Sequence, residues 1–94
     1  MRTLRYTATA IAEIEDILTY IAQDNSSAAL RVSVTILATI NRVAEFPHTA
    51  IETNVPEVRV APALPYRYLI FFTLTKDAII VRNVRHAARN RSDL

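Results

Sequence analysis

The chain has 94 residues, of which 51% are hydrophobic and 21% charged, and its formal net charge is +2. This composition is that of a globular protein rather than a disordered segment, and the length predicts a single domain over residues 1–94. No run approaches the roughly 18 apolar residues of a membrane span, and residues 1–10 lack the core of a signal peptide. We therefore expect a cytoplasmic protein without a membrane partner.

Cysteine and glycine are both absent from the sequence. The lack of cysteine excludes a disulfide framework, a thiol nucleophile and a thiolate metal site. His48 and His86 are far apart and the acids are scattered, so we expect no metal and no cofactor. The lack of glycine excludes the phosphate-binding loops of nucleotide-binding proteins. Turns that need a positive φ must then use Asn or Asp, at Asp24, Asn25, Asn54 or Asp77.

Charge is unevenly distributed along the chain. Residues 1–58 hold four Arg and seven Asp or Glu, a balance of −3, whereas residues 59–94 hold six Arg, one Lys and two Asp, a balance of +5. Ten of the eleven basic residues are Arg. Arginine makes planar, bidentate contacts with carboxylates and phosphates and tolerates partial burial. This bias predicts docking on an acidic protein surface or on a few phosphates, not a non-specific polyanion groove.

The first half of the chain reads as a short strand followed by two helices. Leu4 and Tyr6 alternate with Arg5, which predicts a strand over residues 2–6. Thr7 or Thr9 can then cap a helix over residues 8–23. Its apolar stripe and its acids near the start are Ile11, Ile14, Ile17, Leu18 and Ile21, and Glu13, Glu15 and Asp16.

Residues 26–46 are ambiguous over a short window but not over a long one. The stretch 32–36 alternates like a strand, yet helical spacing continues over four turns, and no turn residue interrupts residues 28–46. Length therefore favours a helix, which Pro47 ends because proline disfavours the helical conformation in the residue before it. The two helices should form an antiparallel hairpin. The apolar positions that we expect in its core include Ala29, Val32, Ile36, Ile40 and Val43.

The second half of the chain predicts strands. After a polar loop at 48–56, a short strand over 58–61 should be broken by Pro62. Two apolar runs, 66–74 and 78–85, flank a polar turn at 75–77 and predict a β-hairpin. The tail over 87–94 has room for one helical turn. The chain thus predicts an α+β fold of order β-α-α-β-β-β, with a helical hairpin packed on a small, mostly antiparallel sheet.

Two helices can cover only one face of such a sheet. Side chains alternate between the faces of a strand. The strand over 66–74 therefore places Leu69 and Phe71 on the face opposite to Tyr66, Tyr68, Ile70, Phe72 and Leu74. Exposed, contiguous apolar surface usually marks a partner site. We therefore predict that this protein works as part of a complex.

The order of elements and several local sequences resemble the toxins of the RelE/ParE superfamily, and the ParE branch in particular. The resemblance covers nearly the whole chain, although the loop 48–56 lacks the glycines and arginines common there in relatives. The matching pieces are Ile17-Leu18-Thr19-Tyr20-Ile21-Ala22 followed by Asn25, Ala44-Glu45-Phe46-Pro47, Leu64-Pro65-Tyr66-Arg67, and Val84-Arg85-His86-Ala87-Ala88-Arg89.

This resemblance implies the toxin of a type II toxin–antitoxin system. Such a toxin would bind DNA gyrase, trap it on cleaved DNA and block replication, without covalent chemistry of its own and without specific nucleic-acid binding. A ParD-like antitoxin would neutralise it by wrapping its C-terminal segment around it. The alternatives are a RelE-like, ribosome-dependent mRNA endonuclease and an inactive module that binds only the antitoxin.

The basic end of the chain supplies the candidate binding residues. For target or antitoxin binding they are Arg59, Arg67, Arg82, Arg85, His86, Arg89, Arg91, Tyr68 and Phe71. Only the endonuclease alternative needs catalytic residues, namely Arg67, His86 and Arg89, because RNA cleavage requires a base, an acid and a cation on the phosphate. RelE-like nucleases tend to carry many lysines and a Tyr near the end, whereas this chain has Lys76 alone and ends in Arg-Asn-Arg-Ser-Asp-Leu. A structural role, as a surface ion pair for Arg67 and a hydrogen-bonded strand end for His86, competes with each assignment.

Overall fold

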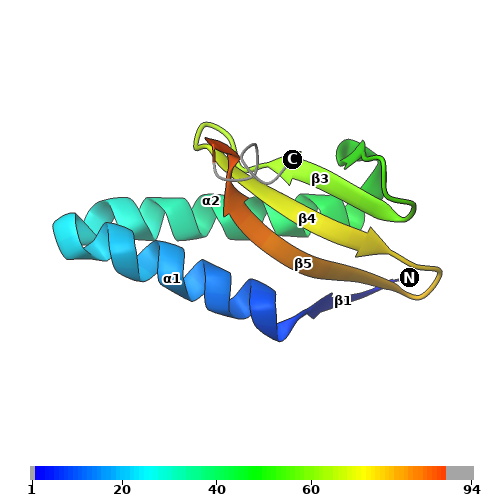
Figure 1. Cartoon of the computed structure of the whole chain (residues 1–94), viewed down its shortest axis with the longest axis horizontal. Helices are drawn as coiled ribbons and strands as arrows, with labels where there is room; N and C mark the ends of the chain where they lie inside the picture. Colours follow the sequence, from blue (N-terminus) through cyan, green and yellow to red (C-terminus); the bar gives the residue numbers. More distant parts are fainter. Residues whose placement is uncertain (1, 89–94) are drawn as a thin grey trace.

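The computed structural model describes residues 2–88 and forms two helices on one five-stranded sheet (Figure 1). It confirms the predicted α+β order and adds one short strand. The elements are β1 (Thr3–Tyr6), α1 (Ala8–Asp24), α2 (Ser26–Glu45), the 3₁₀ turn η1 (Pro47–Thr49), β2 (Ile51–Glu52), β3 (Val58–Pro62), β4 (Tyr68–Leu74) and β5 (Ala78–His86). Of the helical turn predicted over 87–94, residues 89–94 lie outside the described part of the chain.

The sheet has the strand order β1-β5-β4-β3-β2. β1 runs parallel to β5, and the other three pairs are antiparallel, as predicted for a mostly antiparallel sheet. In Figure 1, α2 passes behind the strands while α1 lies beside it and follows β5. In the described part of the chain, both helices therefore cover the same face of the sheet.

Thr7 and Asn25 set the starts of the two helices. The Thr7 hydroxyl accepts a hydrogen bond from the backbone N–H of Ala10 at 3.0 Å, and the Asn25 side-chain oxygen accepts one from Ala28 at 3.0 Å. Such side-chain caps satisfy backbone donors that the first helical turn leaves free. Asn25 also donates its own N–H to Ile21 at 2.9 Å, so one residue ends α1 and begins α2.

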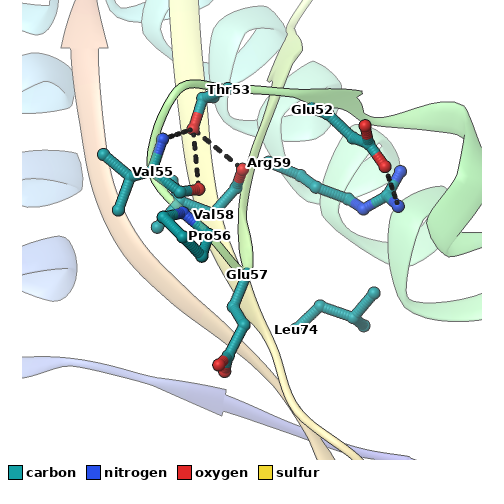
Figure 2. A pocket seen from close by; sticks show the side chains of 8 residues that line it. All are labelled: Glu52, Thr53, Val55, Pro56, Glu57, Val58, Arg59 and Leu74. Carbon is teal, nitrogen blue, oxygen red and sulfur yellow. Dashed lines mark hydrogen bonds and ion pairs between the residues drawn. The ribbon is translucent and has the colours of Figure 1, made fainter.

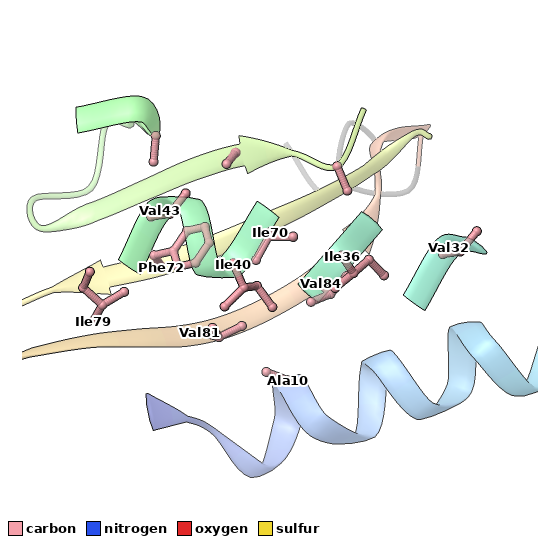
Figure 3. Packing of buried hydrophobic residues seen from close by; sticks show 13 residues of the cluster. Ala10, Val32, Ile36, Ile40, Val43, Ile70, Phe72, Ile79, Val81 and Val84 are labelled. Carbon is pink, nitrogen blue, oxygen red and sulfur yellow. The ribbon is translucent and has the colours of Figure 1, made fainter. Parts of the chain in front are cut away.

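The core lies between α2 and the strands β4 and β5 (Figure 3). Each large side chain buried there contributes roughly 1.5–3 kcal/mol relative to full exposure. This packing confirms the helical interpretation of residues 26–46. The buried residues include Val32, Ile36, Ile40 and Val43 of α2, Ile70 and Phe72 of β4, and Ile79, Val81 and Val84 of β5.

The apolar stripe of α1 begins one residue earlier than predicted, at Ala10 instead of Ile11. Ala10 is fully buried, whereas Ile11, which we expected in the core, is 48% exposed. The cap at Thr7 fixes where the helix starts, and the small Ala10 side chain lets this first turn approach the sheet closely. Ile14, Leu18 and Ile21 remain partly buried against the core, as predicted.

The segment around residues 48–67 departs from the prediction in three places. The loop 48–56 contains η1 and β2, and β2 pairs with β3. Pro62 belongs to β3 instead of breaking it, because it is the last residue of the strand and lies beyond the reach of β2. β4 starts at Tyr68, because a tight turn closed by the hydrogen bond from the Tyr66 N–H to the Ala63 carbonyl precedes it, and Arg67 connects this turn to the strand.

Positive φ occurs at Glu57, not at the predicted Asn or Asp positions. Among residues 2–88 the one positive φ is 68°, at Glu57. The Glu57 carbonyl accepts a hydrogen bond from the N–H of Leu74 at 2.8 Å, and the next residue, Val58, donates to Val55 at 3.1 Å. These contacts fix the backbone at Glu57 against its local preference.

We predict that the protein is more stable with glycine than with alanine at position 57, where it has Glu57. The left-handed conformation costs an L-residue roughly 1–2 kcal/mol, a cost that glycine avoids. The free energy of unfolding of Glu57→Gly should therefore be about 1 kcal/mol higher than that of Glu57→Ala. Denaturant titration measures this difference. At Glu45, in the last turn of α2, the order should reverse, since alanine is the better helix former. The same order at both positions would contradict the strain at Glu57.

Candidate functional site

Four of the candidate residues meet at the end of the β4–β5 hairpin, away from its turn. Tyr68 and His86 are register partners, and their rings meet edge to face with centroids 5.6 Å apart. The carbonyl of Arg67 accepts a hydrogen bond from the N–H of Ala87 at 2.7 Å. Arg85 precedes His86 on the same strand. The topology thus gathers Arg67, Tyr68, Arg85 and His86 from two segments of the chain.

A cleft of about 580 Å³ separates this end of the sheet from α1. Aromatic side chains, apolar side chains and charged side chains of both signs line it. Its lining residues are Glu13, Asp16, Ile17 and Tyr20 of α1, and Tyr68, Val84, Arg85 and His86 of the hairpin. The contribution of α1 to this site was not predicted, because the apolar positions of α1 were expected only in the core.

Glu13 of α1 makes polar contacts with the hairpin. Its Oε1 accepts hydrogen bonds from the N–H of Val84 at 3.0 Å and from the amide of Asn83 at 3.2 Å. Its Oε2 lies 3.8 Å from Nε of Arg85. The sequence does hold a signal for this role. Glu13 follows buried Ala10 by three positions, which places a carboxylate on the inward side of an amphipathic helix.

Tyr68 and His86 both offer hydrogen-bond donors to the cleft. Burial raises the pKa of the Tyr68 phenol above its ordinary value, and the nearby Tyr20 hydroxyl raises it further. Tyr68 therefore keeps its proton and remains a donor at neutral pH. Nδ1 of His86 accepts a hydrogen bond from the N–H of Ala88 at 3.2 Å. In the neutral ring the proton then sits on Nε2, so His86 presents a donor to a ligand.

Arg82 and Phe71 lie elsewhere on the sheet. The β4–β5 register passes from the pair Phe71 and Asn83 to the pair Phe72 and Val81, so Arg82 is the extra residue of a β-bulge. The Arg82 carbonyl accepts a hydrogen bond from the Thr7 hydroxyl at 2.9 Å, and its side chain is exposed. Phe71 is half-buried on the face that the helices do not cover.

Arg59 belongs to a second hollow, at the far edge of the sheet (Figure 2). This hollow measures about 340 Å³ and lies against the turn that joins β2 to β3. Nη2 of Arg59 lies 3.2 Å from a carboxylate oxygen of Glu52, and Nη1 donates to the Ala50 carbonyl at 3.1 Å. Arg59 thus has the structural role of tying β3 to the chain before β2. Arg89 and Arg91 lie outside the described residues.

Two apolar surfaces are open in the described structure. On the sheet face opposite the helices, Leu69 and Phe71 are half-buried and share their face with Val58, Val60 and Ile80 through the strand register. On the outer side of α2, Leu30, Val34 and Leu37 are 66%, 59% and 50% exposed. Their spacing of four and three residues makes one stripe. The open sheet surface was predicted from the alternation of side chains along β4, whereas the stripe on α2 was not predicted.

Within residues 2–88, no three His, Asp or Glu side chains are grouped so that they could hold a metal ion. In the same part of the chain, neither helix combines the length and the apolar character needed to cross a membrane.

Comparison with known proteins identifies the family. Residues 4–91 match the family model of the ParE toxin of the type II toxin–antitoxin system parDE. A chain from the chromosomal ParDE system of P. aeruginosa is 18% identical, with a TM-score of 0.80 over 92% of this chain and 96% of that one. No curated protein matches the chain significantly.

Two further solved structures share the fold more distantly. A chain of the YoeB dimer from Staphylococcus aureus is 8% identical, with a TM-score of 0.61 over 90% of this chain and 95% of that one. A chain of the E. coli DinJ–YafQ complex is 15% identical, with a TM-score of 0.54 over 95% and 97%. Because the family match spans nearly all of the sequence and the fold agrees with it, this chain belongs to the ParE toxin family of type II toxin–antitoxin systems.

Proposed function

We propose that this ParE-type toxin acts in the cytoplasm, where it binds DNA gyrase and blocks replication, without covalent chemistry of its own. The observation that carries the proposal is the match to the ParE family over residues 4–91. The candidate site supports it, because Arg67, Tyr68 and Arg85 lie together at one end of the sheet.

The cationic end of the sheet is suited to an acidic protein surface. Arg67 is exposed there, and Arg85 is half-buried at the wall of the cleft. Exposed cations of this kind accelerate association with an acidic partner, whereas a cation that becomes desolvated at the interface also slows dissociation. Tyr68 adds an aromatic surface with a protonated hydroxyl. Aromatic residues and arginine are the residue types that most often dominate binding energy at protein interfaces.

The endonuclease alternative is favoured by one observation, the meeting of Arg67 and His86 at the same end of the sheet. Cleavage of RNA needs a group that removes the proton of the 2′-hydroxyl. In His86 the nitrogen that carries the free lone pair, Nδ1, already accepts the N–H of Ala88. For His86 to act as a base, this hydrogen bond would have to break. This hydrogen bond counts against His86 as the base of the reaction and has no bearing on a role as its acid.

We predict that induction of this toxin triggers the DNA-damage response while mRNA stays intact. His86→Gln, which keeps a hydrogen-bonding side chain, should reduce toxicity only mildly. Arg67→Ala combined with Arg85→Ala should reduce it strongly, because both changes remove cations from the docking end. A DNA-damage reporter and primer extension on mRNA from translating cells measure the two effects.

The control for this experiment is Arg31→Ala, an exposed arginine of α2 away from the cleft, which should leave growth inhibition unchanged. Rapid mRNA cleavage that His86→Gln abolishes would contradict the gyrase proposal and favour the endonuclease. No growth inhibition by the folded, expressed wild-type chain would favour an inactive module that binds only the antitoxin.

We infer that a ParD-like antitoxin covers the open apolar surfaces of this chain. The stripe of Leu30, Val34 and Leu37 on α2 is the clearest of them. Exposed apolar patches on a chain of this size are a common mark of a protein partner. A domain of this length also buries a smaller share of its surface than a large one, which limits its stability alone. A partner that binds only the folded state raises stability by mass action.

We predict that saturating antitoxin raises the thermal midpoint of the toxin. At a free antitoxin concentration one hundred times the Kd, the gain is about 2.7 kcal/mol. Val34→Glu should weaken antitoxin binding by placing a charge on the covered stripe. Thr9→Glu, an exposed change in the first turn of α1, should not. Calorimetry with and without antitoxin measures both, and an unchanged midpoint at saturation would refute the inference.

A further inference from the structure

We propose that Glu13 is a positioning residue that holds Arg85 in the orientation in which Arg85 docks on the target. This inference rests on the proposed function, because it assigns to Arg85 a direct contact with the target. It concerns a carboxylate of α1 and three successive residues of β5, about 70 positions away in the sequence.

The need for such a residue arises at the outer edge of β5. The ladder between β1 and β5 ends at the pair Tyr6 and Val81, whereas β5 continues to His86. In the described residues, no strand lies along this edge beyond Val81. The N–H of Val84 would therefore lack a strand partner, and Oε1 of Glu13 accepts it at 3.0 Å. A half-buried donor left without a partner is costly.

The same carboxylate also fixes the side chains on both sides of Val84. Oε1 accepts from the Asn83 amide at 3.2 Å, and Oε2 lies 3.8 Å from Nε of Arg85. Because Val84 and Asn83 hold one oxygen, the direction of the other is set. The position of Oε2 then defines where the guanidinium of Arg85 is most favourable. Glu13 thus links the geometry of the β5 backbone to the position of the Arg85 side chain.

Stability alone accounts poorly for the contact with Arg85. Both side chains are partly exposed, 36% for Arg85 and 26% for Glu13, and a pair of this kind contributes little to folding. The contact between Glu13 and Arg85 affects binding more than it affects folding. An arginine that is already ordered loses less conformational freedom when it docks, and preorganisation of this kind improves affinity. The hydrogen bond to Val84 therefore supports the fold, and the contact to Arg85 serves the target.

A double-mutant cycle on gyrase binding tests the proposal. Glu13→Gln keeps an oxygen that can accept the N–H of Val84 but removes the charge that holds Arg85. We expect Glu13→Gln to weaken binding about three- to tenfold, the effect of one side chain that must be ordered on docking. In an Arg85→Ala background the same change should have no further effect, since Glu13 acts through Arg85. Equal effects in both backgrounds would overturn the proposal.

A second measurement on the free toxin separates this proposal from the proposed function. The heteronuclear NOE of the Arg85 Nε–H group reports whether its side chain is ordered. It should indicate an ordered group in the wild type and in Glu15→Gln, an exposed neighbour on α1, and a mobile one in Glu13→Gln. If the wild type does not bind gyrase, the proposed function fails while this readout still tests the role of Glu13. An Arg85 that stays equally ordered in Glu13→Gln overturns it.

Discussion

The outer edge of β5 beyond Val81, along which the described residues place no strand, is the constraint on which the rest of this structure depends. A strand edge inside a small protein carries backbone groups that need hydrogen-bond partners. β1 supplies them only as far as Val81. Thr7 supplies the next two partners. Its N–H donates a hydrogen bond to the Val81 carbonyl at 3.0 Å, and its hydroxyl donates one to the Arg82 carbonyl at 2.9 Å. Since the same hydroxyl caps α1, the helix has to begin at this point and run along β5.

The position of α1 then determines the site. Because α1 follows the edge of β5, its inward side passes the end of the β4–β5 hairpin and forms one wall of the cleft there. Glu13 reaches the strand where β1 no longer does. Asn25 turns the chain back into α2, whose inner side fills the core. The helices thus cover one face of the sheet and leave apolar surface on its other face and on the outside of α2, where a partner can bind.

The sequence predicts those features that are determined by local periodicity or by residues that end a helix or a strand. The helix over 26–46 follows from long-range spacing, and the hairpin follows from two apolar runs around a polar turn. Features that depend on the ends of distant strands were not predictable in this way. The positive φ at Glu57 follows from its contact with Leu74, and the burial of Ala10 in place of Ile11 follows from where β1 ends.

The same distinction applies to the candidate site. The sequence identified the cations of the second half but could not separate Arg59 from Arg85, because their partners are set by the fold. Arg59 pairs with Glu52 at the far edge of the sheet, whereas Arg85 meets Glu13 at the cleft. A chain seen without its topology does not reveal that α1 and the end of β5 share a surface. The sequence feature that could have indicated this shared surface is Glu13, an acid on the inward side of α1.

Amide hydrogen exchange at Val84 tests most directly whether α1 replaces the missing strand neighbour of β5. The account predicts slow exchange of the Val84 N–H in the wild type and in Glu15→Ala, and fast exchange in Glu13→Ala. The amides that join β4 to β5 should stay protected in all three proteins, which shows that the sheet remains folded. Val84 exchange that is unaffected by Glu13→Ala would contradict the account.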